Sequence, residues 1–183
     1  MDGGKREEEF ALLRTIFNDA WVNNWGFVPF TEAEFSELGK QLRLLLEDDL
    51  VQIAKVDRVA AAFMICLPNL NEAIRDLDGR LLPFGWVKAL WRLRRHRVKT
   101  ARIALMGVRR QYHDSPLGAA LAMSVIGATL APAVGYGIER GELSWVLEDN
   151  VGMLNILEAI GARPYKRYRI FEKTLPAATA PQG

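Results

Sequence analysis

The fold of this chain is decided by residues 100–150, which read TARIALMGVRRQYHDSPLGAALAMSVIGATLAPAVGYGIERGELSWVLEDN. Their pattern predicts a strand over residues 100–108, a polar loop over 109–114, a helix starting at Ser115-Pro116, and a second strand over 142–147. A helix that follows a strand and a polar loop presents unpaired N–H groups and the positive end of its dipole. Because both suit a negative charge, the stretch predicts an anion-binding unit.

Upstream of this stretch, the pattern predicts two helices and then two strands. The predicted ranges are residues 7–23, about 32–47, 50–56 and 59–67. Thr31 and Glu34 have the spacing of a capping box, and Phe30 can pack on Phe35 as a hydrophobic staple. Asp57-Arg58 is short enough to form a two-residue hairpin turn between the strands.

Downstream, Asn150 or Asp149 caps a further helix that runs through Ile160 and ends at Gly161. Residues 165–173 predict a last strand, and the small residues of 176–183 predict a disordered tail. No internal repeat or interdomain linker is visible. We therefore expect a single domain over residues 1–175, of the α/β or α+β class, with a mixed, mostly antiparallel sheet covered by helices on both faces.

The segment from Ser115 to Ile138 carries no charge, and its length raises the question of a transmembrane helix. Its content is mainly Ala and Gly, however, and Leu, Ile and Val are too sparse to drive insertion strongly. Leu121 and Val125 share one helical face at a four-residue step. We predict a helix that is buried against the sheet and broken near Pro132.

The composition is that of a soluble globular protein: 183 residues, 50% hydrophobic, 25% charged and a net charge of +2. The single cysteine, Cys66, lies in an apolar run, which predicts a buried strand residue rather than a nucleophile. With two histidines and one cysteine we expect no metal site. The N-terminal residues lack the apolar core of a signal peptide, so we expect a cytoplasmic protein, with peripheral membrane association as an open alternative.

The charge is unevenly distributed, because residues 80–113 contain no Asp or Glu. Within them, residues 83–97 predict a helix in which Trp86 and Trp91 stand beside Lys and Arg, as in an interfacial helix. A solvated basic face, phosphate binding and contact with an anionic membrane surface all stay open. We do not expect a nucleic-acid partner, because no nucleic-acid motif accompanies the charge.

Three stretches resemble the GNAT superfamily of N-acyltransferases: VQIAKVDRVAAAFMICL, IALMGVRRQYHDSPLGAALA and ELSWVLEDNVGMLNILEAIGARPYKRYRIFEK. The likeness covers nearly all of residues 10–175. It is greatest to the C-terminal half of a long bacterial subfamily of GNAT-like proteins, with which the chain shares phrases such as NWGFVPFTEAEF and GRLLPFGW. The resemblance implies a GNAT-like sheet whose first strand would precede Met1.

The same resemblance implies acetyl-CoA or a longer acyl-CoA as co-substrate, and a small-molecule or lipid-like amine as acceptor. The pantetheine would pair with the end of the strand over residues 100–108, and the pyrophosphate would lie at the following loop and helix start. The implied cofactor-binding residues are Met106, Gly107, Val108, Arg109, Ser115, Leu117, Gly118, Ala119 and Asn150.

The phosphate loop departs from the family pattern Arg/Gln-x-x-Gly-x-Gly/Ala. With Gln111 in the first position, Asp114 and Pro116 replace the two glycines. Ser115 is a good N-cap and Pro116 suits the first helical position. We therefore expect the N–H groups of the next three residues, Leu117, Gly118 and Ala119, to be free for a phosphate, although the Asp114 carboxylate would repel it.

The family's usual catalytic acid, a tyrosine seven residues after the asparagine, is replaced by Leu157. The remaining catalytic candidates are Glu142, Tyr165 and Tyr168. Each candidate also has a structural alternative. Glu142 could be a strand-edge carboxylate paired with an arginine, and the two tyrosines could simply pack in a strand.

Three functions stay open on these residues: an acyl-CoA-dependent N-acyltransferase, a GNAT-like binding or regulatory module without catalysis, and a peripheral binder of anionic membranes through residues 80–102. A homodimer is compatible with each of them.

Overall fold

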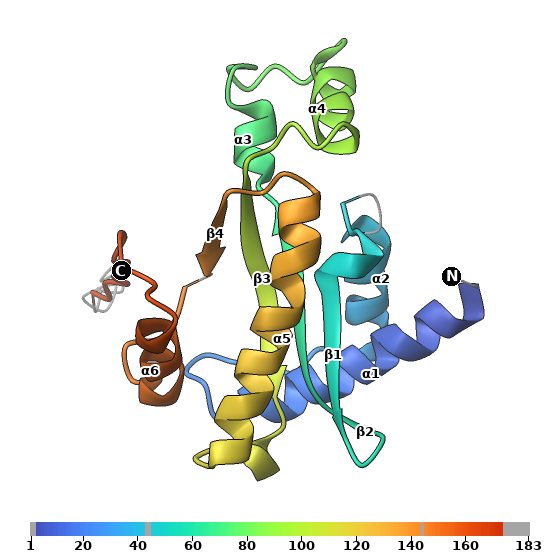
Figure 1. Ribbon diagram of the computed structural model, residues 1–183. Coiled ribbons are helices and arrows are strands. Elements are labelled where there is room, and N and C mark those ends of the chain that lie inside the picture. The colour runs from blue at the N-terminus through green and yellow to red at the C-terminus, as the bar shows by residue number, and fades with distance from the viewer. Residues whose placement is uncertain (1–2, 43–44, 144, 174–183) are drawn as a thin grey trace, which may run out of the picture.

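The computed structural model describes residues 3–42, 45–143 and 145–173 (Figure 1). Its helices and strands, in chain order, are α1 Gly3–Trp21, α2 Glu32–Leu42, β1 Val51–Val56, β2 Val59–Pro68, α3 Leu70–Ile74, α4 Gly85–Arg94, β3 Thr100–Val108, α5 Pro116–Gly135, β4 Arg140–Leu143 and α6 Val151–Ala159. Two 3-10 turns, η1 Asp48–Leu50 and η2 Arg110–Tyr112, precede β1 and follow β3.

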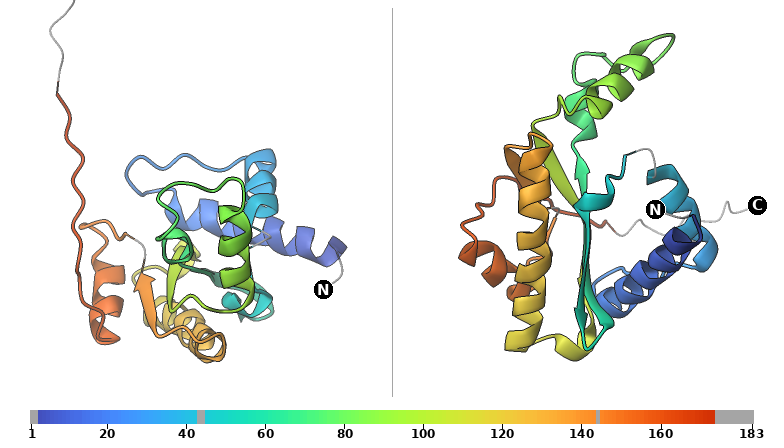
Figure 2. Two further views of the ribbon diagram at one scale, coloured as in Figure 1. Left: turned by 90° about the horizontal axis from the view of Figure 1, so that it is seen from above. Right: turned by 45° about the vertical axis from the view of Figure 1, so that its right-hand side comes forward.

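The sheet has four strands in the order β1-β2-β3-β4. The β1–β2 and β2–β3 pairs are antiparallel, and the β3–β4 pair is parallel. Helices α1 and α2 cover one face, and α5 covers the other (Figures 1 and 2). The predicted mixed, mostly antiparallel sheet with helices on both faces is therefore confirmed.

Successive residues of β2 point into two different hydrophobic cores, because side chains alternate along a strand. Phe63 packs with Leu13 and Phe17 of α1, whereas Met64 and Cys66 pack with α5. Burial raises the pKa of the Cys66 thiol to about 11. Cys66 is thus an inert core residue, as its apolar neighbours predict.

Local signals in the first half of the chain form as predicted. The Glu34 carboxylate accepts from the Thr31 N–H at 2.9 Å, and the Glu34 N–H donates to the Thr31 hydroxyl oxygen at 3.3 Å. The Phe30 and Phe35 rings lie 5.7 Å apart between centroids. The helix α2 that follows covers Glu32–Leu42; residues 43–44 lie outside the described residues, and residues 45–47, the end of the predicted range, are not helical.

The β1–β2 turn is made by Asp57 and Arg58, with φ values of 48° and 68°. Positive φ at both central residues is the two-residue turn whose twist matches that of the strands. The hairpin prediction is confirmed even though no glycine is present.

The long apolar helix α5 meets the length and composition criteria for a membrane span. In the fold it lies along the sheet, and one of its sides is buried through Leu121, Ala122, Val125, Ile126 and Thr129. The predicted break at Pro132 is wrong, since α5 continues to Gly135. A proline this close to the C-terminal end removes one backbone hydrogen bond without disturbing the packed turns before it.

Two strand predictions in the last third need correction. The strand expected over residues 142–147 is β4, which covers Arg140–Leu143; Ser144 lies outside the described residues. In the part of the chain that the structure describes, residues 165–173 are extended but join no ladder. Side-chain contacts hold this segment instead, such as the bond from Arg169 to Glu148 at 2.9 Å. The tail predicted over residues 176–183 also lies outside the described residues.

We expect Phe63→Ala to lower the free energy of unfolding by about 3–5 kcal/mol, because it would leave a cavity at a fully buried ring. Phe171→Ala is the matched control, since the Phe171 side chain is 91% exposed; it should change stability by less than about 0.5 kcal/mol. Urea unfolding followed by circular dichroism measures both. Similar losses in the two variants would contradict the assignment of Phe63 to the core.

Candidate active site

A β-bulge in β3 sets the geometry of the candidate site. The β2–β3 register shifts between Ile65 and Cys66, so Ala104 has no partner on β2. The parallel β3–β4 ladder ends at the adjacent pair, Ile103 and Leu143. Beyond this point the two parallel strands no longer pair among the described residues. The second half of β3, from Ala104 to Val108, therefore has an open edge on the side of β4.

The bulge also changes which peptide groups face that edge. Before it, the Lys99 carbonyl accepts from the chain entering β4 and so faces β4. After it, the Arg109 N–H donates to the Ala61 carbonyl on the β2 side at 2.8 Å. Because peptide directions alternate along a strand, the N–H and C=O groups of Met106 and Val108 must face the open edge.

Both carbonyls at this edge have a protein donor. The Trp21 indole Nε1–H donates to the Met106 carbonyl at 2.9 Å, and His113 Nε2 lies 2.7 Å from the Val108 carbonyl oxygen. The edge therefore presents its two N–H groups as the donors that remain for a ligand carbonyl or a developing oxyanion.

The last turn of α1 holds the end of β3 in place. Asp19 accepts from the Arg110 N–H at 2.9 Å and from the Arg110 guanidinium at 3.2 Å. Gly107 lies so close under α1 that a Cβ there would approach Phe63 to 3.0 Å and Ala20 to 3.1 Å. Helix α1 therefore holds the open edge of β3 and the loop after it in place.

Burial by itself would raise the pKa of Asp19, but hydrogen bonds from Arg110 outweigh it. The positive charges of Arg110 and Arg109 act in the same direction, and the pKa of Asp19 lies below its ordinary value. The folded state therefore favours the ionised carboxylate.

Two N–H groups at the start of α5 are already hydrogen-bonded within the helix and its cap. Ser115 Oγ accepts from the Gly118 N–H at 3.1 Å and donates to the Tyr112 carbonyl at 2.6 Å. The Ser115 carbonyl accepts from the Ala119 N–H at 3.2 Å. Ser115 is the predicted N-cap, but the expectation that Gly118 and Ala119 offer free N–H groups is wrong, because the cap and the first helical turn use them.

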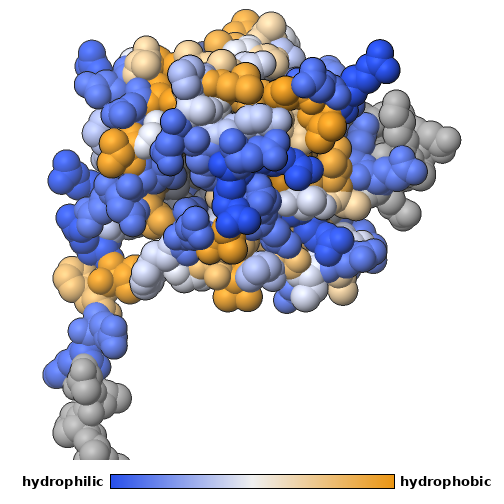
Figure 3. Space-filling model, turned by 90° about the horizontal axis from the view of Figure 1, so that it is seen from below, coloured by the Kyte–Doolittle hydropathy of each residue, from blue (hydrophilic) through white to orange (hydrophobic). Residues whose placement is uncertain are grey.

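Two residues of the phosphate loop and the helix start after it have backbone positions that favour glycine. A Cβ at Gly118 would lie 2.0 Å from the Tyr112 carbonyl oxygen, so a larger residue there would require the loop to move. Asp114, which replaces a glycine of the family pattern, has a φ of 52°, a conformation that glycine adopts more readily. This loop lies at the lower end of Figure 1, and Figure 3 views that end, where hydrophilic side chains gather in the middle of the face.

Two of the three catalytic candidates come together in the structure. Tyr165 lies beside Glu142 of β4, and the interaction with Glu142 is the main reason that the pKa of Tyr165 is raised. Lys166 Nζ lies 4.9 Å from the centre of the Tyr165 ring. The Tyr168 ring packs edge-on against Trp145, with 6.3 Å between the ring centroids. Glu142 and Tyr165 thus form a protonated phenol beside a carboxylate.

The remaining predicted residues have structural partners. The Arg109 Nε–H donates to the Ala60 carbonyl at 2.7 Å, which turns this guanidinium toward β2. Asn150 accepts from the Met153 N–H at 3.1 Å, so it is a helix cap, as the sequence suggested. Leu117 is 45% exposed at the start of α5.

Sequence reasoning missed Asp19 and Trp21, which reach the end of β3 from α1. Both residues lie within the helix predicted over residues 7–23. In the sequence they are a carboxylate and an indole two residues apart at the end of a helix. This local pattern does not predict a contact with a strand 85 residues further along the chain.

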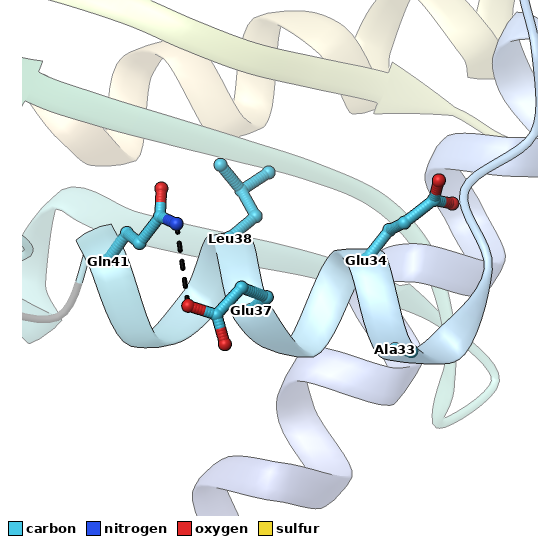
Figure 4. Close-up of a pocket in the computed structure, with 5 residues that line it drawn as sticks. All are labelled: Ala33, Glu34, Glu37, Leu38 and Gln41. Atoms are coloured by element: carbon cyan, nitrogen blue, oxygen red, sulfur yellow. Dashed lines mark hydrogen bonds between the residues drawn. The ribbon is translucent and has the colours of Figure 1, made fainter.

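A separate hollow lies on α2 (Figure 4) and is lined by Ala33, Glu34, Glu37, Leu38 and Gln41. All of these residues come from one helix, and their polar groups already have local partners: Gln41 donates to Glu37 at 3.4 Å, and Glu34 completes the α2 cap. The hollow brings no groups together from different parts of the chain and is not the candidate site.

The fold is that of the GNAT acetyltransferases. A probable acetyltransferase superposes with a TM-score of 0.55 at 16% identity, over 94% of this chain and 95% of the other. AAC(6')-Iy, solved in complex with a CoA-containing bisubstrate analogue, superposes with a TM-score of 0.56 at 14% identity, over 92% and 93% of the two chains. The resemblance to GNAT-like proteins is confirmed.

Two curated proteins have similar sequences. Protein YghO of Escherichia coli K12 is 53% identical over 168 residues, which are 92% of this chain and 43% of YghO. The bacterial ceramide synthase of Caulobacter vibrioides is 46% identical over 175 residues, which are 96% of this chain and 46% of that protein. The chain spans less than half the length of these relatives. No protein-family model matches it.

We expect Asp19→Asn to lower stability at neutral pH by about 1 kcal/mol, through loss of a charge-assisted hydrogen bond. Because the native pKa of Asp19 is depressed, its contribution is complete above the ordinary value of about 3.9 and is lost as the pH falls through the native value.

The two proteins should therefore differ by the same amount from neutral pH down to about pH 4 and converge only below it, as measured by urea unfolding from neutral pH to pH of about 2. Glu158→Gln removes one exposed charge from α6 and serves as the control, which should run parallel to the original protein. A constant gap between Asp19→Asn and the original would contradict the assigned role of the Asp19 charge.

Proposed function

We propose that this chain is an acyl-CoA-dependent N-acyltransferase unit. The open edge of β3, which begins at the Ala104 bulge, carries the proposal. An acyl thioester laid along this edge would meet the N–H groups of Met106 and Val108. Its pyrophosphate would extend toward the loop from Arg109 to Ser115, at the start of α5.

In the proposed reaction an amine nitrogen attacks the thioester carbonyl directly. The C–N bond forms, the C–S bond breaks, and the oxyanion that develops in between is stabilised by N–H groups of the β3 edge. Glu142 accepts the proton that the amine loses, and Tyr165 supplies a proton to the departing thiolate. The position of Tyr165 beside Glu142 supports this assignment, because a tyrosine phenol is protonated at neutral pH and can donate its proton.

For the acceptor we propose a lipid-like amine, with a long acyl chain on the CoA. One relative is named a ceramide synthase, and a ceramide is an amide between a fatty acyl group and a long-chain amino alcohol. The outward side of α5 also supports an apolar substrate, since Leu130 and Val134 are 61% and 69% exposed.

A second candidate is a GNAT-like module that binds or regulates without catalysis. Two observations favour it: the N-cap occupies N–H groups that a pyrophosphate would use, and the Asp114 carboxylate stands beside the helix start. Binding of an acyl-CoA and release of free CoA separate the two candidates.

The first experiment is a thermal-shift titration with acetyl-CoA and a long-chain acyl-CoA, followed by a thiol-release assay with a long-chain amino alcohol. We expect a rise in melting temperature that grows with ligand concentration. Asp114→Asn should tighten binding about fivefold, because it removes a repulsive charge of about 1 kcal/mol and keeps a residue that tolerates positive φ. No shift with either ligand, in the original protein and in Asp114→Asn, would contradict the proposal.

A second prediction concerns proton transfer. Tyr165→Phe should lower kcat about 100-fold while leaving the acyl-CoA thermal shift unchanged, because it removes only the hydroxyl. Tyr168→Phe is the matched control, since the Tyr168 ring packs on Trp145 and Glu142 acts on the pKa of Tyr165. Equal activities of Tyr165→Phe and Tyr168→Phe would remove Tyr165 from the mechanism.

A further inference from the structure

Helix α4 and the loop before it form a projection beyond the end of the sheet (Figures 1 and 2). The helix packs on α3, and none of its residues is buried. Gly85 lets the loop close against the helix, because a Cβ there would lie 2.3 Å from the Arg80 carbonyl oxygen. We call the loop and helix, residues 80–97, the α4 projection.

The α4 projection turns two of its cations inward. Asp76, two residues after α3, accepts from Lys88 at 2.8 Å and from Arg92 Nη2 at 2.8 Å. Arg92 also donates to the Ala73 carbonyl at 2.8 Å. Because Lys88 and Arg92 are four residues apart, these bonds fix one side of α4 against α3. The opposite side of the helix faces solvent.

That outward side is apolar. It is formed with the preceding loop by six exposed side chains, which we call the aromatic tip: Leu81, Leu82, Phe84, Trp86, Val87 and Trp91. Leu82 is 80% exposed and Phe84 is 76% exposed. The Trp86 indole N–H donates to the Pro83 carbonyl at 3.0 Å, so its ring can leave water without an unsatisfied donor. Six large apolar side chains exposed within eleven residues indicate an interaction surface.

Unpaired cations surround the aromatic tip. Among residues 3–42, 45–143 and 145–173, no carboxylate pairs with Arg80, Arg94 or Arg95. The Arg97 guanidinium lies over the Trp91 ring at 5.9 Å. Residues 80–113 contain no acidic side chain that could oppose this charge. The surface therefore combines apolar rings with a positive rim, and its complement is an apolar layer under a layer of negative charge.

We infer that the α4 projection docks on the surface of an anionic lipid bilayer. The aromatic tip enters the interface, and Arg94, Arg95 and Arg97 meet the lipid phosphates. A projecting segment that has both features, and no Asp or Glu of its own over residues 80–97, favours a bilayer over a protein groove. Nucleic acid would use the arginines but would leave Leu82 and Phe84 in water. The inference is independent of acyl transfer, which is measured in solution with CoA thioesters.

The test is flotation of the whole chain with vesicles of phosphatidylcholine containing one third phosphatidylglycerol, beside vesicles of phosphatidylcholine alone. We expect binding to the anionic vesicles that high salt reverses. Leu82→Ser with Phe84→Ser, and separately Arg94→Glu with Arg95→Glu, should each weaken binding at least about tenfold. Circular dichroism and the melting temperature establish that the variants fold.

Two matched controls change the same chemistry elsewhere. Trp25→Ser with Val28→Ser removes two exposed apolar side chains near α1, which are 70% and 78% exposed. Arg163→Glu with Arg167→Glu reverses two charges on the C-terminal segment. Both controls should bind like the original protein.

Several results would overturn the inference: no binding to anionic vesicles at low salt, equal loss in the controls, or tighter binding to double-stranded DNA than to vesicles. Concentration-dependent self-association that Leu82→Ser with Phe84→Ser abolishes, without vesicle binding, would assign the aromatic tip to a second copy of the chain instead.

Discussion

The bulge at Ala104 is the constraint on which the rest of the structure depends. Without it, the alternation of β3 would continue and the peptide groups of Met106 and Val108 would face β2. With it, β3 pairs with β4 over the first half of its length, and among the described residues the second half has an open edge. The end of α1 stabilises this arrangement, because Trp21 and Asp19 bind the part of β3 that has lost its neighbour.

The start of α5 shows how one set of backbone groups can serve either stability or binding. A serine N-cap stabilises a helix by about 1 kcal/mol, by accepting from N–H groups that would otherwise be unpaired. Here Ser115 does so for Gly118, while its hydroxyl proton holds the Tyr112 carbonyl. An anion at the same place would compete with that cap, so a ligand must draw on the N–H groups of the β3 edge and on the neighbouring arginines as well.

The sequence alone predicted the features that short-range chemistry decides. The capping box before α2, the hairpin turn at Asp57 and the N-cap at Ser115 each depend on residues within four positions of one another, so a local pattern suffices. The buried side of α5 also follows from its four-residue spacing. The mixed sheet followed from the order of these elements.

Contacts between residues far apart in the chain could not be predicted from the sequence. Ala104 has no signature of a bulge, and the bond between Asp19 and Arg110 joins residues 91 positions apart. Residues 165–173 have the composition of a strand, but a strand needs a neighbour that offers its backbone, and among the described residues none does. The meeting of Glu142 with Tyr165 likewise depends on where the chain returns after α6.

Cys66 has a practical consequence for studying all of these features. It is the one cysteine of the chain, it is 3% exposed, and burial raises the pKa of its thiol to about 11. A thiol reagent acts on the thiolate and needs access to it, so the Cys66 thiol does not react under mild conditions. The protein is therefore ready for site-directed labelling: a single cysteine introduced at an exposed position would carry the only fluorophore or spin label, and would report distance and motion without a cysteine-free background.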